Sequence, residues 1–105
     1  MYDIFIRQKQ QIIGIVIFAV VMFLYAITLA PTLTQKHLGI DSGDLLTATY
    51  NLGVPHPTGY PTYILLLKLF SFLTPFGNFA LKGNLFSALL GATSCILVYY
   101  IRSEE

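Results

Sequence analysis

Long apolar runs alternate with short polar stretches along this chain, and three of the runs are long enough to suggest membrane helices. Residues 12–30 contain no charged side chain, and a helix of this length rises about 28 Å, close to the hydrocarbon thickness of a bilayer. Residues 60–76 and 85–101 form the second and third runs. The pattern predicts an all-α membrane protein with about three transmembrane helices over these ranges.

The stretch between the first two runs contains a shorter helix signal. Pro31 ends the first helix, because its ring clashes with continued helical geometry. Asp41 or Ser42 is a natural N-cap for a short amphipathic helix over about residues 42–52. Gly53 is placed to cap the C-terminus of that helix. We expect this juxtamembrane helix to lie along the membrane surface, in the first extracytoplasmic loop.

A proline-rich turn precedes the second apolar run. Pro55, Pro57 and Pro61, together with Gly59, exclude regular helix or strand over most of this stretch and give a rigid, turned backbone. Pro61 can open the next helix, because its fixed φ suits the first helical position. The second run is short for a span, so a re-entrant segment is the alternative to a crossing helix.

One cation interrupts the second apolar run. Lys68 either extends its long stem toward Pro75 and the membrane surface or faces a polar cavity. Residues 75–83, which include Lys82, form a tight connection to the third run. The third run ends in an interfacial anchor of Tyr99, Tyr100 and Arg102.

The basic residues favour one orientation of the chain. If all three runs cross, one side holds three basic residues and the other holds two, which places the N-terminus in the cytoplasm. The three are Arg7, Lys9 and Lys82, and the two are Lys36 and Arg102. A cleaved signal peptide is the rival interpretation of the first run, because small residues end it near Ala30.

Composition supports a membrane protein and excludes some functions. Hydrophobic residues make up 55% of the chain and charged residues 10%, which is too apolar for an ordinary soluble domain. The net charge of +1 and the scattered basic residues provide no surface for nucleic acid. Cys95 has no partner for a disulfide and is expected to pack inside a helix. Three helices enclose little volume, so we expect a fragment or a subunit of a larger protein.

Two carboxylates in the polar stretch are candidates for chemistry. Asp41 and Asp44 are three residues apart at the start of the short helix, near backbone N–H groups that favour negative charge. Plain helix capping needs only one of them. The functional alternatives are a general base that acts on a hydroxyl and a metal ligand. The chain supplies no further set of ligands, so we expect no all-protein metal site, and a divalent cation as cofactor stays open.

His56 lies between two prolines, which nearly fix its backbone. It is either a solvated loop residue or a group that contacts a phosphate or transfers a proton near neutral pH. The chain has no His-Glu metal spacing, no Ser-His-Asp order and no glycine-rich phosphate loop of a recognised kind.

A family resemblance rests on three strings in the sequence. They are A-P-T-L-T, D-S-G-D-L-L-T-A-T-Y-N-L-G-V-P-H-P-T-G-Y-P-T-Y-I-L-L-L-K-L-F and K-G-N-L-F-S-A-L-L-G-A. They resemble the N-terminal part of a bacterial membrane protein family of formerly unknown function, related to protein O-mannosyltransferases of the C-type glycosyltransferase fold. The likeness extends from about Ala30 to Ala92. Its most specific feature is D-S-G-acid followed by H-P-x-G-Y-P about a dozen residues later.

This resemblance implies a role for each motif. In that fold the first extracytoplasmic loop carries an essential acidic residue, and the sugar donor is a polyprenyl-phosphate sugar. The acidic motif falls on Asp41 and Asp44, of which Asp41 matches the first acidic position. The second motif implies substrate binding by His56, Gly59 and Tyr60.

The resemblance also implies a function for the whole. We expect residues 1–105 to be the N-terminal segment of a polytopic membrane glycosyltransferase in the bacterial inner membrane. The reaction would transfer a sugar, with mannose a candidate, from the lipid-phosphate donor to a hydroxyl of a protein or glycan. The isolated chain is expected to be inactive and to need the remainder of the enzyme as a partner. The alternative is a small non-enzymatic membrane subunit whose polar loop binds a partner.

Overall fold

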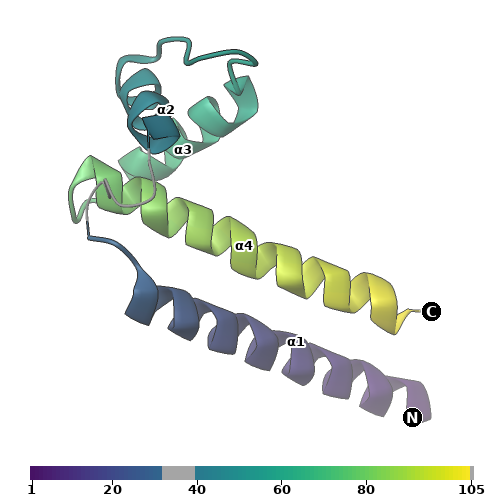
Figure 1. The fold of residues 1–105 in the computed structure, drawn as a ribbon. Coiled ribbons are helices and arrows are strands. Elements are labelled where there is room, and N and C mark those ends of the chain that lie inside the picture. Colours follow the sequence, from purple (N-terminus) through teal and green to yellow (C-terminus); the bar gives the residue numbers. More distant parts are fainter. Residues whose placement is uncertain (32–39, 105) are drawn as a thin grey trace. The chain divides into compact units, whose positions relative to one another are not determined.

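The computed structural model describes residues 1–31 and 40–104 and contains four α-helices in this part of the chain (Figure 1). In chain order they are α1 (Tyr2–Thr28), α2 (Ile40–Asn51), α3 (Pro61–Leu73) and α4 (Phe79–Ser103). The prediction of an all-α protein is confirmed for the described residues. Lys36 and His37 lie outside them.

The chain divides into two compact units. One unit combines Met1–Leu29 with Ser87–Glu105, and the other is Ala30–Phe86. The first unit therefore holds α1 and most of α4. The second holds α2, α3 and the first turns of α4, and it contains both sequence motifs.

In the first unit, α1 begins ten residues earlier than the predicted helix of residues 12–30. It starts at Tyr2 and ends at Thr28, where Leu29 turns to an extended conformation at φ −64° and ψ 127°. The first ten residues are mostly long-chain polar and apolar residues without proline or glycine, so nothing stops the helix from including them. The prediction that the first helix ends before Pro31 is confirmed, and the helix ends two residues earlier than predicted.

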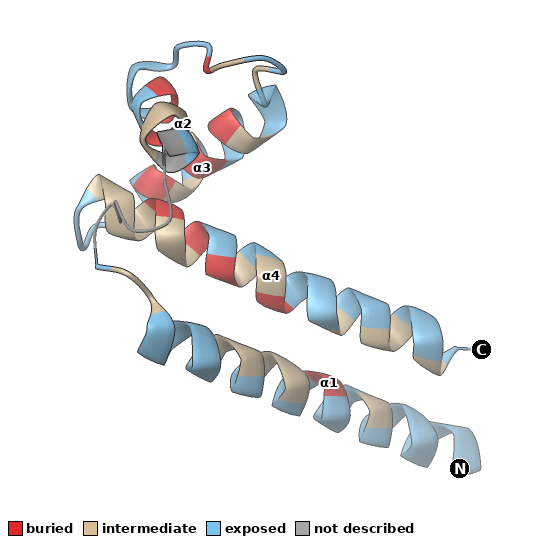
Figure 2. Ribbon diagram, viewed as in Figure 1, coloured by how far each residue is buried: buried red, intermediate tan, exposed pale blue. Residues whose placement is uncertain are grey.

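α1 and the C-terminal part of α4 pack antiparallel through two reciprocal glycine–tyrosine contacts. Tyr100 of α4 lies on Gly14 of α1, where a β-carbon would come within 2.5 Å of the phenol oxygen. Tyr25 of α1 lies on Gly91 of α4, where the corresponding distance is 2.8 Å. Gly14 is the buried residue of α1, whereas most of the helix is exposed (Figure 2). Small residues at a helix contact let a large neighbour approach closely.

Two of the described helices, α1 and α4, are long and apolar enough to cross a membrane. Their most apolar segments have mean hydropathies of 2.5 and 1.6, and little of either segment is buried within the protein. Exposed apolar side chains along such helices indicate association with a membrane. The third predicted span is not confirmed, because α3 has only 13 residues and rises roughly 20 Å.

The second unit has a small apolar core. Leu46 of α2, Leu67 of α3 and Phe86 of α4 are buried against one another. The ring of Phe86 packs against Phe70 and Tyr63, with centroid separations of 5.3 Å and 5.6 Å. Each helix thus contributes one side chain to the centre. The core fixes the start of α4 against α2 and α3 in this unit.

The connection between α3 and α4 is shorter than predicted. α3 ends at Leu73, because Pro75 favours the extended conformation that Thr74 adopts at φ −108° and ψ 100°. The Thr74 hydroxyl and backbone N–H both donate to the carbonyl of Phe70. The Asn78 side chain accepts the N–H of Leu81 at 2.8 Å, as an N-cap does, so α4 begins at Phe79. The predicted connection over residues 75–83 is wrong, since its last five residues, Lys82 and Gly83 among them, are helical.

Two lysines bind the C-terminal ends of helices. The ammonium group of Lys68 donates to the carbonyl of Tyr50 in α2 at 2.6 Å, and that of Lys82 donates to the carbonyl of Ser71 in α3 at 3.0 Å. The last carbonyls of a helix lack partners within the helix and carry partial negative charge, which favours a cation there. Lys68 therefore binds a helix end in the described part of the chain, a contact that neither predicted role included.

The number of spans can be tested by labelling on both sides of α3. We expect a membrane-impermeant maleimide to label cysteines at Thr58→Cys and at Phe76→Cys from the same side, because α3 is too short to cross. Both substitutions are made in a Cys95→Ser background, and both positions are exposed. Labelling from opposite sides would show that α3 crosses, as three spans require.

Candidate functional site

The two sequence motifs meet through one side chain, that of Asp44. Its carboxylate oxygen Oδ2 accepts the backbone N–H of His56 at 2.9 Å and lies 2.6 Å from Nδ1 of the His56 ring. Asp44 lies in α2 and His56 in the loop before α3, twelve residues further along the chain. The pair is partly open to solvent, with 43% of the Asp44 side chain and 38% of the His56 side chain exposed. Asp44 therefore ties the D-S-G-D motif to the H-P-x-G-Y-P motif.

The same contacts determine the charge of Asp44. The hydrogen bond from the His56 backbone N–H, and then the one from the His56 ring, lower the pKa of the Asp44 carboxyl. A lowered folded-state pKa means that the stabilisation is fully present above the ordinary pKa of aspartate. It is lost only as the pH falls through the lowered value. At neutral pH the carboxylate is ionised and holds the loop.

The H-P-x-G-Y-P loop turns tightly around His56. The N–H of Gly59 donates to the carbonyl of His56 at 2.9 Å, and the ring of Tyr60 meets the His56 ring edge-on at a centroid distance of 5.4 Å. Gly59 and Tyr60 have φ of +86° and +46°, a conformation that glycine adopts freely and tyrosine rarely. The three residues predicted to bind substrate therefore form one turn.

Pro61 opens α3 directly after this turn, as the sequence predicts. The carbonyl of Tyr60 accepts the N–H of Ile64, which makes Tyr60 the residue before the helix. Pro55, on the other side of His56, is buried. The buried Pro55, the start of α3 at Pro61 and the carboxylate of Asp44 together fix the position of His56.

Asp41 has a different environment from Asp44. It is exposed and lies in the first turn of α2. Because α2 begins at Ile40, the prediction that Asp41 or Ser42 is the N-cap is wrong. Within the described part of the chain, no hydrogen bond or ion pair engages its carboxylate. Among the described residues, Asp41 thus differs from Asp44, whose carboxylate is bound by His56.

The end of α2 sets the path of the loop toward His56. The N–H of Gly53 donates to the carbonyl of Ala48 at 2.8 Å, and the N–H of Leu52 donates to that of Thr49 at 3.4 Å, the pattern of a Schellman cap. Leu52 adopts the left-handed conformation at φ +52°. The capping role predicted for Gly53 is therefore shared between Leu52 and Gly53, which both donate to carbonyls of the last turn. The chain turns back on itself here, which brings His56 to Asp44.

An apolar groove of about 450 Å³ borders this loop. It lies between the end of α2 and the first turns of α3 and has glycines and aliphatic side chains on its walls. Its lining residues are Leu52, Gly53, Val54, Thr58, Gly59, Pro61, Ile64 and Leu65. His56 lies between two of these residues in sequence, so the groove and the histidine share one loop.

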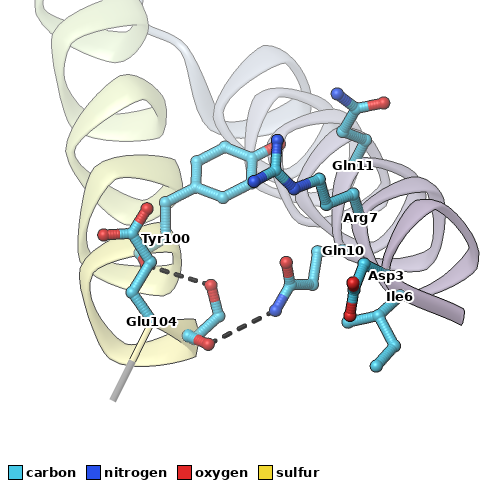
Figure 3. Close-up of a pocket in the computed structure, with 8 residues that line it drawn as sticks. Asp3, Ile6, Arg7, Gln10, Gln11, Tyr100 and Glu104 are labelled. Carbon is cyan, nitrogen blue, oxygen red and sulfur yellow. Dashed lines mark hydrogen bonds between the residues drawn. The ribbon is translucent and has the colours of Figure 1, made fainter.

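A second pocket, of about 520 Å³, lies in the first unit where the ends of α1 and α4 meet (Figure 3). Arg7 and Gln10 of α1 point toward α4, and the Gln10 amide donates to the carbonyl of Ser103 at 3.3 Å. Asp3 and Glu104 also line the pocket, so its acids outnumber its one arginine. It contains none of the motif residues.

The described residues contain no group of three or more His, Cys, Asp or Glu side chains that could hold a metal ion. Asp44 and His56 are a pair without a third ligand of this kind. Cys95 is exposed on α4, so the prediction that it packs inside a helix is wrong.

Comparison with known proteins identifies the family. A family model described as the protein O-mannosyl-transferase TMEM260 N-terminal domain matches residues 41–104. The chain belongs to this family. The matched region begins at Asp41 and contains both motifs.

Relatives of this chain include two proteins that share one name. Protein O-mannosyl-transferase TMEM260 of Mus musculus is 42% identical over 87 residues, which cover 83% of this chain and 12% of the mouse protein. Protein O-mannosyl-transferase tmem260 of Dictyostelium discoideum is 28% identical over 87 residues, which cover 81% of this chain and 10% of that protein. The chain thus spans about a tenth of each relative. No solved structure matches it.

These relatives support part of the resemblance. They relate the chain to proteins named protein O-mannosyl-transferase. Both come from eukaryotes, so they give no support to a bacterial source. The C-type fold and the site residues stay predictions.

Sequence reasoning missed the contacts of four residues in the second unit. Lys68 and Lys82 bind helix ends, and Asn78 caps α4. Asn84 donates to the carbonyl of Ala30 at 2.8 Å. An asparagine directly before F-A-L-K is a recognisable N-cap signal, but the lysine contacts depend on tertiary structure and have no local signal.

Proposed function

We propose that this chain is the acid-bearing N-terminal segment of a membrane glycosyltransferase. The enzyme would transfer mannose from a polyprenyl-phosphate donor to a hydroxyl group of a protein. Membership of the TMEM260 N-terminal domain family supports the class of reaction. The observation that carries the proposal is the bond between Asp44 and His56, because it joins the two motifs of the resemblance into one site outside the two candidate spans.

Asp41 is the proposed general base. A hydroxyl group is a poor nucleophile at neutral pH, and a carboxylate within hydrogen-bond reach accepts its proton as the oxygen attacks. The oxygen forms a bond to the anomeric carbon, the bond from that carbon to the phosphate oxygen breaks, and the phosphate leaves with the electron pair. Attack from the opposite face inverts the configuration. Asp41 suits this role because it is exposed, whereas Asp44 is engaged by His56.

The apolar groove supports a lipid-linked donor. Aliphatic walls beside the loop offer a place for hydrocarbon near a phosphate. A nucleotide sugar has no such apolar part. The two candidate spans would keep the loop beside the bilayer that holds the donor.

The orientation that fits this proposal places the loop outside the cytoplasm, with α1 and α4 in the membrane. The N-terminus would then be cytoplasmic. A divalent cation is not assigned, because the described residues offer no ligand set. The inner membrane of a bacterium stays a prediction of the resemblance.

The proposal can be tested by transfer assays on two proteins. We expect the full-length protein that carries this segment to transfer mannose from a polyprenyl-phosphate donor to a protein hydroxyl, and to ignore a nucleotide-linked mannose. The purified 105-residue chain should transfer none, because its two long helices do not enclose both substrates.

Two outcomes would contradict these expectations. Turnover by the 105-residue chain would show that the remainder is dispensable. A full-length protein that neither binds nor uses the lipid donor, and a chain that forms a stable homo-oligomer, would favour a non-enzymatic membrane subunit.

A further inference from the structure

His56 is held by several independent contacts. Asp44 binds both its backbone N–H and its ring nitrogen Nδ1, and Tyr60 packs edge-on against its ring. These two residues are the titratable groups that face the ring from the described elements. The other ring nitrogen, Nε2, makes none of these bonds, and the side chain is 38% exposed. The pair therefore presents one nitrogen in a fixed direction.

The surrounding cations are already engaged. Residues 40–61 contain no lysine or arginine. Lys68 and Lys82, the lysines of the second unit that the structure describes, each donate to a helix carbonyl. Within residues 40–61, which contain both motifs, His56 is thus the basic side chain that can donate to an anion. An imidazolium donates through both nitrogens, so one N–H can bind Asp44 while the other binds an anion.

We propose that His56 contacts the phosphate ester of the sugar donor through Nε2, and that Asp44 is the positioning residue that fixes its ring. This inference rests on the proposed function, which supplies a lipid-linked phosphate. The groove beside the same loop then takes the start of the hydrocarbon chain. As the bond to the sugar breaks, negative charge grows on the phosphate, and a preorganised donor there stabilises the transition state.

The direct test uses nuclear magnetic resonance of the histidine rings in maltoside micelles, which contain no phosphate. The chain has two histidines, and a His37→Gln variant assigns the His56 signal. Farnesyl phosphate should shift the Nε2 resonance of His56, and farnesol should not. No shift with either farnesyl phosphate or inorganic phosphate would overturn the inference, and this arm requires no variant at the site.

The probes also separate the possible sources of phosphate. An equal response to inorganic phosphate and farnesyl phosphate would support the contact and identify the bare phosphate group as the ligand. A stronger response to farnesyl phosphate would support the contact together with the groove.

Variants test the two roles. We expect His56→Gln and Asp44→Asn each to weaken binding of farnesyl phosphate at least about tenfold, because the first removes the donor nitrogen and the second removes the carboxylate that fixes the ring. In Asp44→Asn the Nδ1 resonance of His56 should also lose the shift that a hydrogen bond to a charged carboxylate causes. A role of Asp44 in stability alone would not require this change. Asp3→Asn, a first-turn acid of α1, is the matched control and should bind as the wild type does.

Failure of the inference differs from failure of the proposed function. Normal binding by both variants would overturn the inference even if the full-length protein transfers mannose. A phosphate-dependent shift in a full-length protein that transfers no mannose would overturn the function and support the contact.

Discussion

Asp41→Asn is expected to lower mannose transfer by the full-length protein at least about a hundredfold, since general-base assistance contributes about a hundred- to ten-thousandfold. The substitution keeps the shape of the side chain and removes its basicity. Asp41 lies in the first turn of α2 and is exposed, so the fold should lose only the small helix-dipole contribution of one exposed charge. The measurement is initial transfer rate at matched expression, with insertion checked by protease protection.

Asp3→Asn is the control, because Asp3 is also an exposed acid in the first turn of a helix. Its transfer rate should stay at the wild-type value. If Asp41→Asn transfers nearly as well as the wild type, Asp41 is not the base. Asp44→Asn would then be examined for the loss.

Leu67→Ala is expected to cost about 3 kcal/mol of stability in the second unit, because a leucine-to-alanine change in a core loses apolar burial and leaves a cavity. Leu67 is fully buried and lies between Leu46 and Phe86. Without it, the packing between α2 and α3 is weakened, and Asp44 and His56 are held less firmly at their separation. Hydrogen exchange in detergent should show faster exchange across α2 and α3.

Leu69→Ala is the matched control on the same helix, since 56% of Leu69 is exposed. In detergent its effect should be much smaller. Equal exchange rates in the two variants would mean that the described core does not stabilise this unit.

Helix positions could be predicted where the sequence carries a local signal. α2 was expected at about residues 42–52 and occupies Ile40–Asn51, and α3 begins at Pro61, as its proline indicates. α1 extends further than expected because the first ten residues, although several are charged or polar, suit a helix. α4 starts earlier because Asn78 caps it, a signal hidden by the nearby Pro75 and Gly77.

The site could be predicted only in part, because its central contact depends on tertiary structure. Motif spacing identifies Asp44 and His56, but their contact depends on the path of the chain after α2. That path follows from Leu52 in a left-handed conformation, which the sequence gives no reason to expect of a leucine beside a glycine. The contact of Asp44 with His56, which the exposed Asp41 does not share, follows from the same turn.

The reciprocal contacts between α1 and α4 also determine how this helix pair can vary. Tyr100 packs on Gly14 and Tyr25 packs on Gly91, each in a space that any side chain larger than hydrogen would fill. The two contacts lie far apart along the pair, so together they prevent both sliding and rotation of one helix on the other. Register is therefore encoded by four residues, and the many exposed apolar positions of α1 and α4 are free to change among apolar residues.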